Sequence, residues 1–274
     1  MAAILEDTAL TREFQAERDD FSACLNTSLR MAIQNTRIDF IPGCVELGDR
    51  DPTSTTIGIS PCGELGNIPE PQLSNTFNWF YQHIQDRRAN KFEWQAYLPY
   101  EIRAAGTYLY LGQKDRTLDL LEYYLSDRRP LNWNQWPEIN LHDREAPKFI
   151  GDMPHSWVGS DYIRTIRSLF VYERESDEAL VVGAGLAEAW VTDPVGVTVK
   201  RLPTYYGVID YTVRTIGNRV TFDLSGRLEV PKGKIVVRSP LQAAVRGIEG
   251  PGSLSTDHRE AVVAKLPARI TFVY

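Results

Sequence analysis

The residues best suited to chemistry lie in one short segment, which reads R-P-L-N-W-N-Q-W-P-E-I-N from position 129. It combines two tryptophans, several side-chain amides and a single carboxylate, Glu138. Sugar rings stack on tryptophan faces, and sugar hydroxyls need hydrogen-bond donors and acceptors side by side. The segment therefore predicts a carbohydrate site in which Trp133, Trp136 and Asn134 bind the sugar and Glu138 is the catalytic candidate.

A second segment, G-D-M-P-H-S-W-V-G-S from position 151, predicts the start of a helix that runs from Pro154 to about Tyr172. Proline suits the first helical turn, and Asp152 or Met153 is expected at the capping position. His155 lies at this helix start. It either hydrogen-bonds a sugar hydroxyl or packs as a structural histidine, and the sequence favours neither reading.

The same residues also have plainer interpretations. The carboxylate of Glu138 alternatively pairs with one of three nearby arginines, Arg128, Arg129 and Arg144. Trp94 and Trp157 are further candidates for a sugar-stacking platform. Tryptophan is mostly buried in any protein, so at least two of the four candidate tryptophans are expected in the core.

Glycoside hydrolysis with inversion needs two carboxyl groups about 6.5–9.5 Å apart. If the second group belongs to this chain, the segment 44–64 must supply it, and Glu46 or Asp49 is the preferred residue. Asp51 is instead expected to bond to the backbone of its own loop. The D-x-D-x-T spacing lacks the glycine and the distal glutamate of a calcium loop. Neither a metal ion nor a cofactor is expected.

The bulk composition limits the classes of partner. A net charge of -6 and the lack of a basic stripe argue against nucleic acid. No apolar run is long enough to span a bilayer, and the first residues do not resemble a signal peptide. The three cysteines form no C-x-x-C pair, which speaks against a zinc or redox motif. These features predict a cytoplasmic protein, or an extracellular one if upstream sequence is missing, and the Trp-rich segment makes carbohydrate its expected partner.

Hydrophobic periodicity predicts helices in the first part of the chain, at about 11–36, 74–88, 99–111, 115–127 and 154–172. The first of these places Phe14, Phe21, Leu25 and Leu29 on one face and charged or amide residues on the other. Ser74 and Asp115 are expected as N-caps, and the turn at 112–115 predicts a helical hairpin. The stretch 37–67, rich in Pro and Gly, predicts a long ordered loop without a regular element.

Beyond Glu178 the apolar period changes to two, which indicates strands around 197–199, 209–213, 220–224, 235–237 and 269–274. The expected fold class is α+β. An α/α-hairpin region would occupy residues 1–176, and an antiparallel β-sandwich would occupy residues 177–274.

Two motifs carry a resemblance to a known family. N-Q-W-P-E at Asn134–Glu138 and M-P-H-S-W-V-G-S at Met153–Ser160 occur in the order and at the spacing of the six-hairpin glycosidases. The chain resembles the C-terminal half of these (α/α)₆-toroid enzymes, and the α-L-rhamnosidase-like families most. In that family a W-E-x-W loop delivers the general base, a helix opening N-H-Y-A-x-G-S-V follows, and a β-sandwich comes after the toroid.

The resemblance implies an inverting glycosidase, or a fragment or subunit of one, with Glu138 as the general base. A complete toroid has twelve helices, whereas about five are expected here. Either an N-terminal half is missing, or a homo-oligomer completes the ring, or a general acid is recruited locally. The alternative is a non-catalytic carbohydrate-binding or assembly module that keeps the remnants of the toroid.

Overall fold

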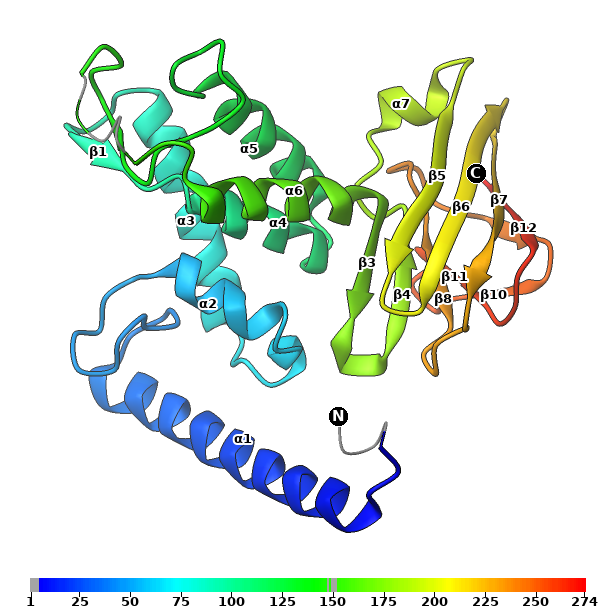
Figure 1. Cartoon of the computed structure of the whole chain (residues 1–274), viewed down its shortest axis with the longest axis horizontal. Helices are drawn as coiled ribbons and strands as arrows, with labels where there is room; N and C mark the ends of the chain where they lie inside the picture. Colours follow the sequence, from blue (N-terminus) through cyan, green and yellow to red (C-terminus); the bar gives the residue numbers. More distant parts are fainter. Residues whose placement is uncertain (1–4, 147, 149–151) are drawn as a thin grey trace. The chain divides into compact units, whose positions relative to one another are not determined.

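The computed structural model describes residues 5–146, 148 and 152–274. Within these residues the chain is α+β, with seven α-helices and most of the strands late in the sequence (Figure 1). It divides into two compact units, an N-terminal unit of Met1–Gly58 with Glu64–Phe92 and a C-terminal unit of Ile59–Gly63 with Glu93–Tyr274. This division lies well before the boundary predicted at residues 176–177. Among the described helices, none combines the length and the apolar character that a bilayer crossing requires.

The N-terminal unit contains α1 (Thr8–Thr36), α2 (Pro52–Ile59), a 3-10 helix (Glu64–Gly66) and α3 (Gln72–Arg88). Its core is built around α3, whose Leu73, Phe77, Phe80 and Ile84 are buried. The Thr76 hydroxyl accepts a hydrogen bond of 2.8 Å from the backbone N–H of Ile41. This bond ties α3 to the segment that precedes α2.

The apolar face predicted for α1 is largely exposed to solvent. Phe14, Phe21 and Leu25 are 54%, 71% and 54% exposed, and only Ala32 and Ile33 of this helix are buried. Apolar spacing identifies the face of a helix that is suited to packing, but it does not show which element, if any, packs against that face.

The stretch 37–67 was predicted to lack regular elements, and α2 shows that this prediction is wrong. Asp51 caps the helix, because its carboxylate accepts hydrogen bonds of 3.1 Å from the backbone N–H groups of Thr53 and Ser54. Pro52 occupies the first turn, where its missing N–H costs nothing. The expected bonding of Asp51 to its own backbone is thereby confirmed.

Several helix starts also differ from the prediction. Helix α3 begins before Ser74, and the Glu70 carboxylate accepts the backbone N–H of Ser74 over 3.1 Å. Helix α5 (Lys114–Ser126) has no side-chain cap at its N-terminus. Asp115, which was predicted to be the N-cap, lies within the first turn. His155, and neither Asp152 nor Met153, is the N-cap residue of α6 (Ser156–Phe170).

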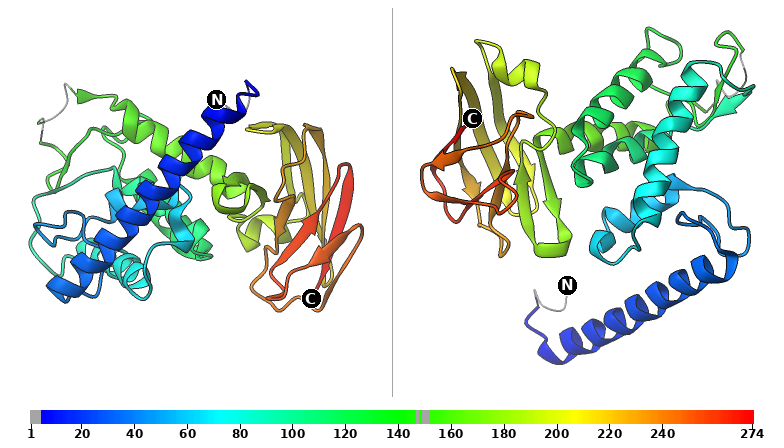
Figure 2. Two further views of the ribbon diagram at one scale, coloured as in Figure 1. Left: turned by 90° about the horizontal axis from the view of Figure 1, so that it is seen from below. Right: turned by 180° about the vertical axis from the view of Figure 1, so that it is seen from behind.

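In the C-terminal unit, α4 (Glu101–Tyr110) packs against both α5 and α6 (Figure 2). A short connection joins α4 to α5, as the turn signal predicted. Gly106 permits the close approach of α4 to α6, because a Cβ atom there would lie 2.8 Å from the Thr165 hydroxyl.

Two five-stranded sheets complete this unit, with the strand orders β10-β11-β8-β4-β3 and β5-β6-β7-β12-β9. The second sheet is antiparallel, whereas β4 and β8 pair in parallel within the first. The first sheet comprises β3 (Val171–Arg174), β4 (Ala179–Val182), β8 (Ile235–Arg238), β10 (Gly252–Leu254) and β11 (Glu260–Val263). The second comprises β5 (Val197–Thr204), β6 (Gly207–Ile216), β7 (Arg219–Leu228), β9 (Gly247–Glu249) and β12 (Ala268–Val273).

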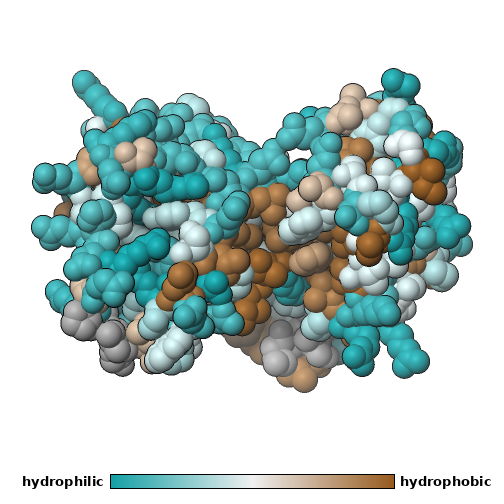
Figure 3. Space-filling view, turned by 90° about the horizontal axis from the view of Figure 1, so that it is seen from above, coloured by the Kyte–Doolittle hydropathy of each residue, from teal (hydrophilic) through white to brown (hydrophobic). Residues whose placement is uncertain are grey.

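One apolar core lies between the two sheets. Leu180 and Val182 of the first sheet and Tyr211 and Phe222 of the second belong to it, and all four are at most 2% exposed. The predicted alternation in β6 and β7 is confirmed, since alternate residues of both strands are buried. Other apolar residues lie at the protein surface, and Figure 3 shows hydrophobic residues near the middle of a mostly hydrophilic face.

The helices of the C-terminal unit are tied to its sheets without a linker. Helix α6 ends at Phe170, and β3 begins at the next residue. The guanidinium of Arg167 donates two hydrogen bonds of 2.7 and 2.8 Å to the carboxylate of Glu173. The Lys114 ammonium donates to the backbone carbonyls of Leu186, over 2.9 Å, and of Pro240. The short helix α7 (Glu188–Thr192) lies between β4 of the first sheet and β5 of the second in sequence.

Candidate functional site

Glu138, Asp152 and His155 come together in the C-terminal unit. The Nε2 atom of His155 lies 3.9 Å from Oε2 of Glu138 and 3.9 Å from Oδ1 of Asp152. One side-chain ligand atom from each residue lies within 4.8 Å of the other two. The Glu138 side chain is half exposed, whereas that of His155 is only 16% exposed. Solvent therefore reaches the cluster from the side of Glu138.

The backbone around Trp136 positions this cluster. The Trp136 side chain is buried, and its indole N–H donates a hydrogen bond of 2.9 Å to the carbonyl of Tyr124 on α5. The backbone N–H of His155 donates to the Trp136 carbonyl over 3.1 Å. The Glu138 N–H donates to Oδ2 of Asp152 over 2.7 Å. The Trp-rich loop is thus fixed both to α5 and to the start of α6.

Aromatic rings border the carboxylates. The ring of Tyr100 meets the His155 imidazole edge to face, with centroids 5.4 Å apart, and its hydroxyl lies 3.3 Å from Nε2. The ring centroid of Trp157 lies 6.2 Å from that of Tyr100 and 6.3 Å from that of His155, and Trp157 is 67% exposed. Desolvation, followed by the negative charge of Glu138, raises the pKa of Tyr100 above its ordinary value. The site therefore offers a negative charge beside accessible ring faces.

The predicted sugar-binding residues have separate environments. Trp133 is 55% exposed, and Trp136 is buried and presents no face to a ligand. Asn134 is exposed, and its side-chain oxygen accepts a hydrogen bond from Arg128. Trp94 makes edge contacts with Tyr97 and His142, with ring centroids 6.1 and 4.5 Å apart.

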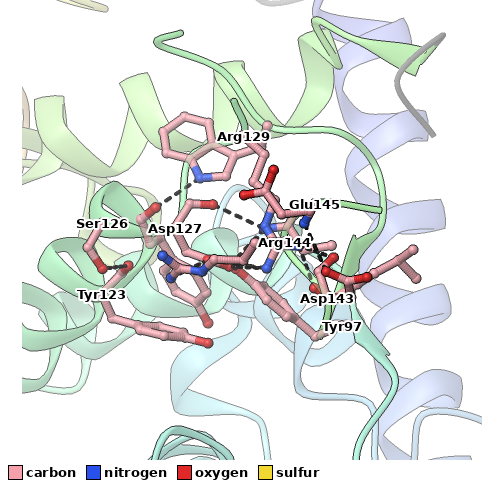
Figure 4. Close-up of polar contacts among 12 residues, drawn as sticks. Tyr97, Tyr123, Ser126, Asp127, Arg129, Asp143, Arg144 and Glu145 are labelled. Carbon is pink, nitrogen blue, oxygen red and sulfur yellow. Dashed lines mark hydrogen bonds and ion pairs between the residues drawn. The ribbon is translucent and has the colours of Figure 1, made fainter. Parts of the chain in front are cut away.

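The alternative partners proposed for Glu138 bind other groups. Arg129 and Arg144 both pair with the buried carboxylate of Asp127, over 3.2 and 2.6 Å (Figure 4). Arg128 donates to the Leu125 carbonyl over 2.8 Å. The described ion pairs of Glu138 comprise only its contact with His155.

Asp127 forms a buried polar network behind the loop. It also accepts hydrogen bonds from the Tyr97 hydroxyl, over 2.5 Å, and from the Asn140 amide, over 3.0 Å. Burial, followed by the charge of Asp127, raises the pKa of Tyr97 well above its ordinary value. Tyr97 and Asn140 are also paired neighbours in the two-stranded sheet of β1 (Ala96–Tyr97) and β2 (Asn140–Leu141). The network fixes the chain immediately after Glu138.

A cavity of about 340 Å³ lies against the same loop. Pro137 and Ile139, the sequence neighbours of Glu138, line it together with basic side chains, among them Arg128, Arg129, Arg144 and Lys148. Two of these arginines are the partners of Asp127, so part of the positive charge is already balanced.

Glu46 and Asp49 lie in the N-terminal unit and bind to their own loop. The Cys44 thiol donates to Oε2 of Glu46 over 3.1 Å, and this hydrogen bond lowers the pKa of Glu46. The Cys44 backbone N–H donates to Oδ1 of Asp49 over 2.9 Å. These contacts agree with structural roles for both carboxylates, and a catalytic role for either stays a prediction.

Comparison of the chain with protein-family models, with curated proteins and with solved structures gave no match. The arrangement of residues therefore carries the functional argument by itself. The sequence reasoning missed Asp152 and Tyr100 as members of the site. Neither residue had a local signal of this role, because the segment 152–155 lies before the first turn of α6, where helical spacing does not apply.

Proposed function

We propose that this chain is a glycoside-hydrolase-like carbohydrate-active protein in which Glu138 acts as the general base. The observation that carries the proposal is the placement of the Glu138 carboxylate. It is half exposed beside His155, and the three arginines considered as its partners bind elsewhere. A base in an inverting glycosidase must be reachable by the water that it activates.

Asp152 is too close to serve as the partner acid in an inverting pair. Its ligand atom lies within 4.8 Å of that of Glu138, whereas inversion needs about 6.5–9.5 Å between the carboxyl groups. Asp152 is proposed to hold the Glu138 backbone instead. The general acid stays a prediction, with Glu46 and Asp49 as the candidates in this chain and another copy of the chain as the alternative source.

The exposed aromatic rings favour a sugar as the ligand. Trp133 and Trp157 present accessible faces in the C-terminal unit, and Tyr100 and His155 offer a hydroxyl and an imidazole nitrogen. The apolar core shared by the two sheets supports the β-sandwich assignment, and the α4–α5 hairpin supports a partial toroid. The second candidate function, a non-catalytic carbohydrate-binding module, uses the same rings and needs no acid.

The test compares Glu138→Gln with wild type on a panel of aryl glycosides. General-base catalysis contributes about 10²–10⁴-fold, so turnover should fall at least about a hundredfold while sugar affinity changes little. Glu122→Gln, on the exposed side of α5, is the matched control and should behave as wild type. Unchanged turnover in Glu138→Gln would remove Glu138 as the base. Sugar binding without any turnover in wild type would favour the binding module.

A further inference from the structure

The cluster at the start of α6 has the composition of a metal site. We propose that Glu138, Asp152 and His155 bind one divalent transition-metal ion, for which Zn²⁺ is the best match. The ligand atoms are Oε2 of Glu138, Oδ1 of Asp152 and Nε2 of His155. The sequence alone predicted no metal, since it has neither a C-x-x-C pair nor a complete calcium loop.

The spacing of the three atoms suits a tetrahedral ion after a small closure. Zinc binds nitrogen and oxygen at about 2.0–2.2 Å, which places its ligands roughly 3.4 Å apart. Both carboxylate oxygens lie 3.9 Å from Nε2. All three ligand atoms lie within 4.8 Å of one another, so the two carboxylates must approach each other by at most about 1.4 Å, and the half-exposed side chain of Glu138 has room on its solvent side to make this movement.

The outer partners of the cluster orient its ligands. Asp152 uses Oδ2 to accept the N–H of Glu138 over 2.7 Å, which leaves Oδ1 facing His155. The backbone N–H of His155 is fixed to the Trp136 carbonyl. Ligands held in this way lose less conformational freedom on binding, and such outer partners tune metal affinity strongly. The carboxylate of Asp152 is thus oriented, and the backbone of His155 is held in place, before an ion arrives.

The donor set selects among metals. One imidazole nitrogen and two carboxylate oxygens suit zinc, manganese or cobalt, whereas calcium needs six to eight oxygen ligands. The exposure of Glu138 leaves a fourth position open to water. A site with three protein ligands and an open position is the form in which zinc serves catalysis rather than structure.

The metal proposal does not depend on the proposed hydrolase activity, although both involve Glu138. A carboxylate oxygen that binds an ion cannot accept a proton from water at the same time. If Glu138 is the general base, zinc should therefore inhibit turnover. The two proposals fail separately, because metal binding is measured without a sugar and turnover is measured in the presence of a chelator.

The experiment is isothermal titration calorimetry of the full chain, purified without a polyhistidine tag and dialysed against a chelator and then against metal-free buffer. Titration with ZnCl₂ should show one strong site per chain, and CaCl₂ should show none. His155→Ala, Asp152→Asn and Glu138→Gln should each weaken zinc binding at least about tenfold. His142→Ala, an exposed histidine outside the cluster, should bind as wild type.

Three free cysteines, Cys24, Cys44 and Cys62, are the competing zinc ligands, so the titration is repeated on a variant with all three changed to serine. Binding should survive in that variant. Wild type without a zinc site, loss of the site with the cysteines, or unchanged affinity in both Asp152→Asn and Glu138→Gln would overturn the proposal. These two variants are nearly isosteric, so they answer the question even if His155→Ala fails to fold.

Discussion

The carboxylate of Asp152 accepts a hydrogen bond of 2.7 Å from the backbone N–H of Glu138. These residues are fourteen positions apart, and the bond joins the Trp-rich loop to the segment that leads into α6. A charged acceptor makes a backbone hydrogen bond stronger than a neutral one. Asp152 therefore fixes the backbone position from which the Glu138 side chain extends. Its other carboxylate oxygen faces His155.

The first prediction follows from this bond. Asp152→Ala should remove the hydrogen-exchange protection of the Glu138 amide and lower the free energy of unfolding by about 1 kcal/mol. Asp143→Ala is the matched control, because Asp143 also accepts a loop N–H, that of Glu145, over 3.0 Å. That control should leave the Glu138 amide protected. Protection that persists in Asp152→Ala would show that other contacts hold the loop.

The second prediction concerns Asp127. Its buried carboxylate balances Arg129 and Arg144 and accepts from Tyr97 and Asn140. Asp127→Asn keeps the shape but leaves a guanidinium that is only 12% exposed without its counter-charge, and breaking such a buried pair costs about 3–5 kcal/mol. Chemical denaturation should report a loss of this size, whereas the exposed Asp143→Asn should change stability by less than about 0.5 kcal/mol. A loss below 1 kcal/mol would mean that the arginines find other partners.

The β region was the part of the fold that the sequence predicted best. In strands such as β6 and β7, Ile209, Val213 and Phe222 alternate with polar residues, because one face is buried and the other solvated. Strands β9 and β10 were missed, since three residues are too few to show a period. Strand β4 is buried throughout, so it has no alternation to detect.

The candidate site could be predicted from the sequence only in part, for a similar physical reason. Local signals placed Glu138 and His155 near accessible aromatic residues, because residue types and short spacings are visible in the sequence. Asp152 and Tyr100 join them through contacts across fourteen and fifty-five positions, which no local pattern encodes. Trp136 and Trp133 have the same residue type and lie three positions apart, yet only the fold decides which one is buried.

The third prediction concerns the pH dependence of stability. Burial raises the pKa of Glu173, but hydrogen bonds from Arg167 and from the Tyr205 N–H outweigh it, so the net pKa lies below the ordinary 4.5. A depressed carboxyl pKa adds stability above the unfolded-state pKa, and this stability is lost as the pH falls through the folded-state pKa. Glu173→Gln should therefore be less stable than wild type by about 1–3 kcal/mol at pH 7. The difference should shrink below about pH 4.5.

Thermal unfolding of both proteins between pH 3 and pH 7 measures this difference. Glu178→Gln is the control, because Glu178 pairs with Lys232 over 2.9 Å at the surface and such a pair contributes under about 1 kcal/mol. A stability gap for Glu173→Gln that stays constant across the whole pH range would contradict the assigned role of the Glu173 charge.

The fourth prediction concerns the exposed face of α1. Phe14, Phe21 and Leu25 are each more than half exposed on one helix, and contiguous apolar patches on a protein surface often mark interaction sites. We expect the chain to self-associate, with a mass that rises with concentration in light scattering. Changing Phe21 and Leu25 to Lys should increase the monomer fraction, whereas Glu17→Lys alters charge on the same helix and should not. A monodisperse wild-type monomer with cooperative unfolding would contradict this expectation.

The last prediction separates the two tryptophans of the loop. Trp136 is 3% exposed and donates to the Tyr124 carbonyl, so Trp136→Ala removes both packing and a buried hydrogen bond. Such a change in a core costs about 3–5 kcal/mol. Trp133 is 55% exposed, so Trp133→Ala should alter the melting temperature little.

If Trp133 stacks on a sugar, its loss should weaken binding by roughly the 0.5–1.5 kcal/mol of an aromatic contact. Melting curves and titration with the best ligand from the glycoside panel, measured on both variants, give the two readouts. Unchanged affinity in Trp133→Ala would remove it from the sugar platform, and the search would move to Trp157 and Tyr100, whose rings lie 6.2 Å apart beside His155.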